Sequence, residues 1–341
     1  MKATRLFRFH EKLNLVELPI PEPGEGEVLA RVLASGICAS DLHIMEGKIS
    51  TVRLPYTPGH ELCGEVHTVG PGVDNLQKGD RFVAAIDVLC GKCRFCREGR
   101  ENLCVHRTRI GFERDGSHAQ YCVVPAANVF PISREIPCEQ AAIIPDAVAC
   151  MYHAFTAQGR VQRGDIVCIL GVGGLGFQGI QIARHLGAKV VVTSRQDRKL
   201  ALAEKAGADG VINTKTQNFR EEIMRFTDGA GCDVVFDNIG IAASVGEAVA
   251  VLRRGGRVVA AGYSDPEFSV NYQDLVLYEK EIIGIRGSTP KELRETIALV
   301  EKGVLKPFVY QTCEFSEINE ALNRLRNSES LGRTVILPWK E

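Results

Sequence analysis

The sequence predicts a mixed α/β protein with two parts: a β-rich, barrel-like domain and a doubly wound domain. Short β-like runs separated by glycine and proline turns fill residues 1–147. From residue 148 to 287 the pattern changes to alternating strands and helices, and a glycine-rich motif follows the first of these strands. These observations place a domain boundary near residue 148.

The β-rich part is expected to contain short strands at residues 27–32, 65–69, 81–85 and 119–124. Turn signals such as Pro23-Gly24 and Pro71-Gly72 occur between and beside these runs. Frequent turns between short apolar runs are typical of a compact β domain.

The second part begins with a buried strand at 166–170, a helix at 175–186 and a strand at 189–193. Alternation continues with strands at 210–212, 233–236, 257–261 and 281–285, and helices at 198–205, 219–226 and 245–252. This pattern predicts a parallel sheet covered by helices. Beyond residue 287 we expect helices at 291–302 and 318–326 and a closing strand at 333–337.

Composition indicates an ordinary globular protein. The chain has 341 residues, a formal net charge of −1, 45% hydrophobic residues and 24% charged residues. This balance argues against a polyanion binder or an acidic disordered chain, and no apolar run approaches 18 residues. The first residues lack the apolar segment of a signal peptide, and twelve cysteines fit a reducing compartment. We therefore expect a cytoplasmic protein with no nucleic-acid or membrane partner.

Four cysteines lie within fifteen residues, in the segment CGKCRFCREGRENLC: Cys90, Cys93, Cys96 and Cys104. A short loop with this spacing can fold four thiolates around one tetrahedral ion, and Zn²⁺ is the usual occupant of such a site. Two disulfides or an iron–sulfur cluster are alternatives that the spacing disfavours. A zinc ion with four protein ligands has no open position, so we expect a structural role.

A second set of candidate ligands comes from distant segments. Cys38 lies in GICASDLH, His60 in PGHELCGEV, and Asp146 in IPDAVAC. One cysteine, one histidine and one carboxylate are the mixed ligand set of a catalytic zinc, which keeps a position for water or substrate. Taken alone, each residue has a more ordinary explanation: Asp146, for example, could cap a helix after Pro145.

The segment GVGGLG follows the strand at 166–170 directly and opens the next helix. In a dinucleotide site Gly171 makes the tight turn, Gly173 lets the backbone approach the pyrophosphate, and Gly176 allows close helix–strand packing. Gly174 and Leu175 complete the turn, and the phosphates lie against the free N–H groups of the helix. The motif therefore predicts a Rossmann-type cofactor domain.

Together these motifs resemble the zinc-dependent medium-chain alcohol dehydrogenases, and the resemblance covers essentially all 341 residues. It implies a GroES-like catalytic domain formed by residues 1–147 and 288–341, with a Rossmann domain at 148–287 inserted into it. It also implies reversible hydride transfer between a primary or secondary alcohol and a nicotinamide cofactor, giving an aldehyde or ketone. Two zinc ions per chain and a homodimer or homotetramer are expected.

The resemblance assigns roles to residues around the second ligand set. Cys38, His60 and Asp146 would bind the catalytic zinc, where many relatives have a second cysteine in place of Asp146. Glu61 would either lie beside the zinc ligands without binding the metal or act as an exchangeable fourth ligand. Asp41 would accept a hydrogen bond from His60 and orient its ring. Further out, a proton relay would run through Ser40 and His43.

By the family's spacing, the residue that meets the adenosine ribose is Ser194, followed by Arg195. An NAD site is expected to have an acidic residue there, whereas a hydroxyl and an arginine suit a 2′-phosphate. We therefore expect NADP rather than NAD. Alternatives are an NAD-dependent polyol or amino-alcohol dehydrogenase of the same family, a cofactor-binding protein that has lost its chemistry, and a zinc-ribbon nucleic-acid binder.

Overall fold

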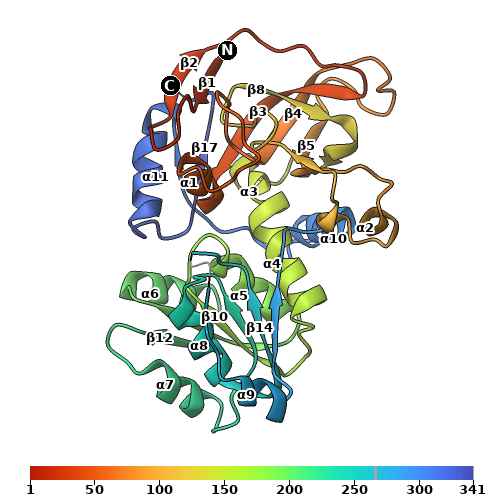
Figure 1. Ribbon diagram of the computed structural model, residues 1–341. Coiled ribbons are helices and arrows are strands. Elements are labelled where there is room, and N and C mark those ends of the chain that lie inside the picture. The colour runs from red at the N-terminus through yellow and green to blue at the C-terminus, as the bar shows by residue number, and fades with distance from the viewer. Residues whose placement is uncertain (265–266, 341) are drawn as a thin grey trace. The chain divides into compact units, whose positions relative to one another are not determined.

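The computed structural model describes residues 1–264 and 267–340, which form two units (Figure 1). One unit contains Met1–Ala149 and the chain from Ser288 onward, and the other contains Cys150–Gly287. In the described ranges, no helix combines the length and the apolar character that crossing a membrane requires.

The first unit is built mainly from antiparallel strands. Its strands are β1 (Lys2–Arg5), β2 (Asn14–Glu17), β3 (Glu27–Ile37), β4 (Glu61–Val69), β5 (Arg81–Ala84), β6 (Asp87–Val88), β7 (Thr108–Arg109), β8 (Tyr121–Pro125), β9 (Val129–Pro131), β16 (Val309–Cys313) and β17 (Arg333–Ile336). Its helices are α1 (Ala39–Met45), α2 (Arg94–Arg97), α3 (Cys138–Ala142), α10 (Pro290–Glu301) and α11 (Ile318–Arg326). A π-helical turn, Ile144–Val148, follows α3.

The main sheet of this unit has the strand order β16-β17-β3-β4-β5-β9, and β8 also pairs with β3. The register pairs Gly36 with Glu61 and Ile37 with Thr334. The end of β3, the start of β4 and the start of β17 therefore lie side by side. A core around Leu62 and Phe82 packs on this sheet, and a second core joins α1 to α11.

The second unit is a parallel sheet with helices between its strands. Its strands are β10 (Ile166–Leu170), β11 (Lys189–Ser194), β12 (Gly210–Asn213), β13 (Cys232–Asp237), β14 (Leu252–Ala260) and β15 (Glu281–Gly284). Its helices are α5 (Gly176–His185), α6 (Asp197–Lys205), α7 (Phe219–Phe226), α8 (Ala242–Ala250) and α9 (Tyr272–Leu277). A further helix, α4 (Ala149–His153), leads into a π-helical turn, Ala154–Gln158.

The order of this sheet is β12-β11-β10-β13-β14-β15. Strands β11 and β12 are added on one side of β10 and strands β13 to β15 on the other, so the strand order reverses between β10 and β13. Ligands of doubly wound proteins bind at the carboxyl ends of the strands at such a reversal. The core is formed by Cys168, Val191, Val235, Val258 and their neighbours. These are strand residues buried on both faces, which explains their continuous apolar runs in the sequence.

Most predicted strands and helices of the second unit are present within a few residues of their expected bounds. Several elements of the first unit were not predicted. They are the β1–β2 hairpin, β6, β7, β9, β16, α1, α2, α3 and the π-helical turn. Each is short or irregular, so its hydrophobic period is too weak to identify from the sequence.

Candidate metal centres and cofactor site

Three segments of the first unit bring Cys38, His60 and Asp146 together. Cys38 ends β3 and begins α1, His60 immediately precedes β4, and Asp146 lies in the π-helical turn after α3. One ligand atom from each lies within 4.8 Å of the others. Asp146 Oδ2 is 3.4 Å from Cys38 Sγ and 3.7 Å from His60 Nε2.

These distances fit a tetrahedral zinc site. Zn–S and Zn–O bonds of about 2.3 and 2.1 Å place two tetrahedral ligand atoms roughly 3.6 Å apart, and Zn–N and Zn–O bonds place them roughly 3.4 Å apart. The observed separations lie within a few tenths of an ångström of both values. Three protein ligands leave the fourth position open, as a catalytic zinc requires.

The carboxylate of Asp41, which is only 1% exposed, faces the ring of His60. Asp41 Oδ2 accepts a hydrogen bond from the backbone N–H of Cys38 at 2.9 Å, and Asp41 Oδ1 is 3.7 Å from His60 Nδ1. Burial lowers the pKa of His60, but Asp146 and Cys38 outweigh it and hold that pKa well above its usual value. A metal ion bound by Cys38, His60 and Asp146 would displace the proton from His60 and supply the positive charge that balances Cys38 and Asp146.

Glu61 forms a buried ion pair with Arg333, a residue that our sequence reasoning missed. Arg333 Nη2 lies 2.7 Å from Glu61 Oε1 and 3.0 Å from Asp146 Oδ2, and its side chain is 5% exposed. Burial raises the pKa of Glu61 to about 8, although Arg333 acts in the opposite direction. Among the described residues, the ligand group contains Cys38, His60 and Asp146 but not Glu61.

Ser40 and His43 are both partly buried residues of α1. Their spacing of three places them on the same side of the helix. Ser40 Oγ lies 3.7 Å from Cys38 Sγ, so the serine borders the ligand group. Burial and then Lys48 lower the pKa of His43 from its usual value, which favours the neutral imidazole.

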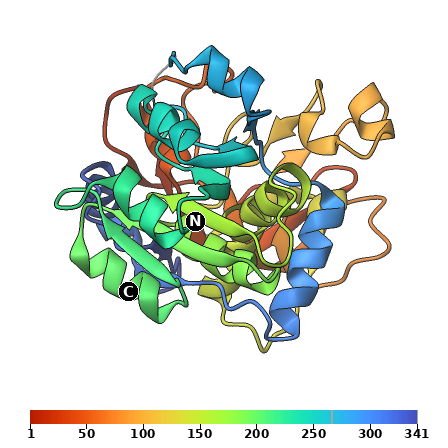
Figure 2. The same cartoon turned by 90° about the horizontal axis from the view of Figure 1, so that it is seen from below.

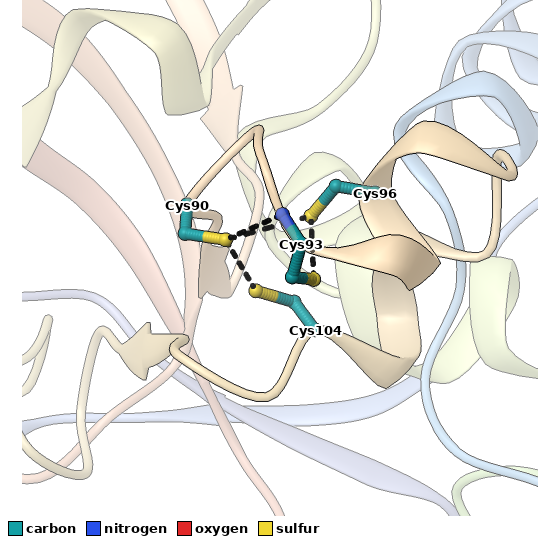
Figure 3. A group of neighbouring side chains, drawn as sticks. All are labelled: Cys90, Cys93, Cys96 and Cys104. Atoms are coloured by element: carbon teal, nitrogen blue, oxygen red, sulfur yellow. Dashed lines mark hydrogen bonds between the residues drawn. The ribbon is translucent and has the colours of Figure 1, made fainter.

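The four cysteines of the second metal group lie in a lobe with little core of its own, around α2. Figures 1 and 2 show this segment in orange, projecting from the strands of its unit. Their sulfur atoms face one another (Figure 3), with separations of 3.5 Å for Cys90–Cys104, 3.6 Å for Cys93–Cys96 and 4.0 Å for Cys90–Cys96. Four Zn–S bonds of about 2.3 Å require sulfur atoms roughly 3.8 Å apart.

The thiols of the lobe differ in pKa: backbone N–H groups lower the pKa of Cys90, whereas burial raises the pKa of Cys96 to about 12. Backbone N–H groups of Cys96 and Val105 lower the pKa of Cys93 to about 6. The twelve cysteines are all free thiols, so the lobe is not closed by disulfides. The geometry fits a structural zinc ion with four protein ligands.

The glycine motif of the second unit forms the turn between β10 and α5. Gly171 has φ +84°, a conformation that side chains disfavour, and a Cβ at Gly176 would lie 2.8 Å from Gly171 O. Around Gly173 no heavy atom of the described residues lies within 4 Å of where a Cβ would be, which leaves room for a phosphate. No side chain of the described residues caps α5 at Leu175, so its first N–H groups face the turn.

Ser194 ends β11, and the next residue, Arg195, is exposed. Ser194 Oγ accepts a hydrogen bond from the backbone N–H of Gln196 at 3.1 Å. An aspartate before a helical run is a common N-cap, but Asp197 does not cap the following helix, α6. Gln196 occupies the cap, while Asp197 lies in the first turn and accepts a hydrogen bond from Asn213 Nδ2 at 2.6 Å.

Two family models match the chain. A model described as "Alcohol dehydrogenase GroES-like domain" matches residues 24–134, and one described as "Zinc-binding dehydrogenase" matches residues 174–302. Each unit therefore matches a model of its own.

Similar proteins span the full length of the chain. An NAD-dependent alcohol dehydrogenase from Sulfurisphaera tokodaii is 32% identical, over 99% of this chain and 100% of that protein. An L-threonine 3-dehydrogenase from Thermococcus kodakarensis is 34% identical, over 96% of this chain and 95% of that protein. The crystal structure of a zinc-binding dehydrogenase from Sinorhizobium meliloti 1021, described as putative and bound to NADP, superposes with a TM-score of 0.90 at 29% identity, covering 99% of each chain.

Proposed function

Because this chain belongs to the zinc-dependent medium-chain dehydrogenase family, we propose that it catalyses reversible hydride transfer between a primary or secondary alcohol and NADP⁺. The observation that carries this proposal is the convergence of Cys38, His60 and Asp146 on one point with a fourth position open. The same chain carries the glycine turn of a dinucleotide site in its second unit.

In this proposal Cys38, His60 and Asp146 hold a zinc ion, and Cys90, Cys93, Cys96 and Cys104 hold a second, structural one. When bound, the first zinc supplies Lewis-acid polarisation of the substrate oxygen, and the nicotinamide supplies the hydride acceptor. The protein's own contribution is orientation and charge balance. Asp41 fixes the His60 ring, and Arg333 balances the buried carboxylates of Glu61 and Asp146.

Oxidation of an alcohol also requires removal of the hydroxyl proton. In this proposal Ser40, which borders the ligand group, accepts this proton at Oγ and releases its own hydroxyl proton outward. His43 lies one turn further along α1 and is the proposed acceptor at the outer end. The lowered pKa of His43 supports this role, because a neutral imidazole can take up a proton.

The proposed preference for NADP depends on the end of β11. Ser194 offers a hydroxyl, and Arg195 is an exposed guanidinium without an ion-pair partner among the described residues. A guanidinium can pair with a 2′-phosphate, whereas an NAD site would offer a carboxylate to the ribose hydroxyl. Relatives include both an NAD-dependent enzyme and a structure bound to NADP, so cofactor use varies within the family.

A polyol or amino-alcohol substrate, with NAD as cofactor, is the second candidate. Asp146 provides a carboxylate ligand, and one relative is named an L-threonine 3-dehydrogenase. A screen of primary, secondary and polyhydric alcohols and L-threonine, each with NADP and NAD, separates the two. Highest kcat/KM with simple alcohols and NADP supports the proposal, whereas highest kcat/KM with a polyol or L-threonine and NAD supports the second candidate.

We further propose that the protein acts in the cytoplasm as a homodimer or homotetramer. The twelve free thiols support a reducing compartment. Light scattering after size-exclusion chromatography tests the oligomeric state, and a monomeric mass would contradict it.

A further inference from the structure

His118 is a fully buried histidine that lies close to the ligand group but is not part of it. Its side chain is 0% exposed, its backbone N–H donates to Pro58 O at 2.9 Å, and its carbonyl accepts from Thr4 N at 2.8 Å. A Cβ at Gly59 would lie 2.5 Å from His118 Nδ1. Glycine at position 59 therefore gives the imidazole room beside His60.

The imidazole of His118 connects two serines to Asp41. His118 Nδ1 is 2.8 Å from Ser35 Oγ, which is 2.7 Å from Ser117 Oγ. On the other side of the ring, His118 Nε2 is 3.6 Å from Asp41 Oδ2. A lone pair on Nε2 would face the carboxylate unfavourably, so Nε2 carries the proton. The other ring nitrogen, Nδ1, then accepts from the Ser35 hydroxyl.

These contacts decide which way the Asp41 carboxylate points. Its Oδ2 accepts from the backbone N–H of Cys38 at 2.9 Å and faces His118 Nε2. Its Oδ1 is therefore left for His60 Nδ1, at 3.7 Å. Burial raises the pKa of Asp41, but His118 and His60 outweigh it and hold that pKa below its usual value.

Three buried atoms at this junction lack a hydrogen-bond partner among the described residues: His118 Nε2, Asp41 Oδ1 and His60 Nδ1. Each faces another of the three residues across 3.6 or 3.7 Å, so a small movement would satisfy them all. We propose that His118 is a positioning residue for the metal ligand His60 and acts through Asp41. This inference rests on the proposed function, since it assumes that His60 binds zinc.

The test compares two substitutions of His118. His118→Phe keeps an aromatic ring but removes the N–H that faces Asp41, whereas His118→Gln keeps an N–H near the position of Nε2. We expect His118→Phe to weaken zinc binding at the Cys38–His60–Asp146 site by about 10–100-fold, the usual effect of losing an outer hydrogen-bond partner. His118→Gln should recover much of this loss. Zinc release to a chelator gives the affinities, and the visible spectrum of the Co²⁺-substituted protein reports the ligand geometry.

His67→Phe is the matched control, because His67 lies in the same unit and packs against Tyr121 at 5.0 Å between ring centroids. It should leave both metals unchanged. The inference is overturned if His118→Phe binds zinc as the wild type does, or if both His118 variants lose zinc equally and melt equally early without metal. Wild-type protein that binds zinc only in the four-cysteine lobe would overturn the proposed function itself, and this inference with it.

Discussion

Arg333 Nη2 lies 2.7 Å from Glu61 Oε1, and neither side chain is more than 5% exposed. Arg333 Nη2 also lies 3.0 Å from Asp146 Oδ2, so removing Arg333 leaves the Asp146 carboxylate without its cation, and breaking a buried ion pair typically costs about 3–5 kcal/mol. We therefore expect Arg333→Met to lower the free energy of unfolding by about this amount. Urea unfolding of the zinc-free protein measures the change without a contribution from the metal.

The double variant Glu61→Met/Arg333→Met removes the Glu61 carboxyl group as well as the guanidinium, so it leaves only Asp146 without its cation and should be more stable than Arg333→Met alone. Arg134→Met is the matched control, because Arg134 pairs with Glu65 at 2.8 Å but is 65% exposed. An exposed pair contributes about 0–1 kcal/mol. Equal losses in the Arg333 and Arg134 variants would contradict this account of the buried pair.

The four-cysteine lobe should depend on its metal for stability. Cys96→Ser removes one of four ligands from a segment with little core, so we expect loss of one zinc per chain and a lower Tm, with alcohol turnover partly retained. Metal analysis and thermal unfolding measure both effects. Cys138→Ser is the control, because Cys138 lies outside both ligand groups. A single zinc per chain in the freshly purified wild type would refute the two-site account.

The proton relay predicts unequal losses from its two members. Ser40→Ala should reduce kcat more than His43→Ala, because water can partly replace the outer group. A positioned proton-transfer group typically contributes about 10²–10⁴-fold. Wild-type rates in both variants would remove the relay from the mechanism.

The pH dependence of kcat/KM gives a second readout of the relay. Burial and then Lys48 lower the pKa of His43 below 6.5, so its neutral form persists at pH 7 and is lost only at lower pH. The wild-type rate should therefore decline on acidification below pH 6.5, and His43→Ala should weaken that decline. Identical profiles would show that His43 takes no part.

We predict that Ser194 and Arg195, at the end of β11, determine whether the enzyme prefers NADP or NAD. Ser194→Asp would place a carboxylate against the 2′-phosphate and offer an acceptor to an unmodified ribose. Preference should move from NADP toward NAD by several kcal/mol, each 1.4 kcal/mol being about tenfold in kcat/KM. Arg195→Ala should weaken NADP and leave NAD nearly unchanged. A wild type that prefers NAD would show that this interpretation of Ser194 and Arg195 is wrong.

Local patterns in the sequence were enough to predict the alternating elements of the second unit. The strand before Gly171 is a short continuous apolar run, a helical pattern follows it, and the turn between them requires glycine. The four-cysteine lobe was equally visible, because its ligands are close together in the sequence. These features depend on neighbours within about twenty residues.

The surroundings of the second ligand group could not be predicted in the same way. Arg333 reaches Glu61 only because β17 pairs with β3 and β3 pairs with β4, contacts between residues far apart in the chain. A charged residue at the start of a buried strand was the one available signal. The sequence held no such signal for His118, since an isolated histidine gives no indication of what it contacts.

Alcohol oxidation is proposed to require a metal held by Cys38, His60 and Asp146, and titrating zinc into protein stripped of metal at this site tests this requirement most directly. Alcohol-dependent reduction of the dinucleotide should rise with occupancy and reach its maximum at one zinc beyond the zinc of the lobe. Cys38→Ser should keep the lobe zinc and bind the dinucleotide, yet remain inactive. Full alcohol turnover in the stripped protein or in Cys38→Ser would contradict the account.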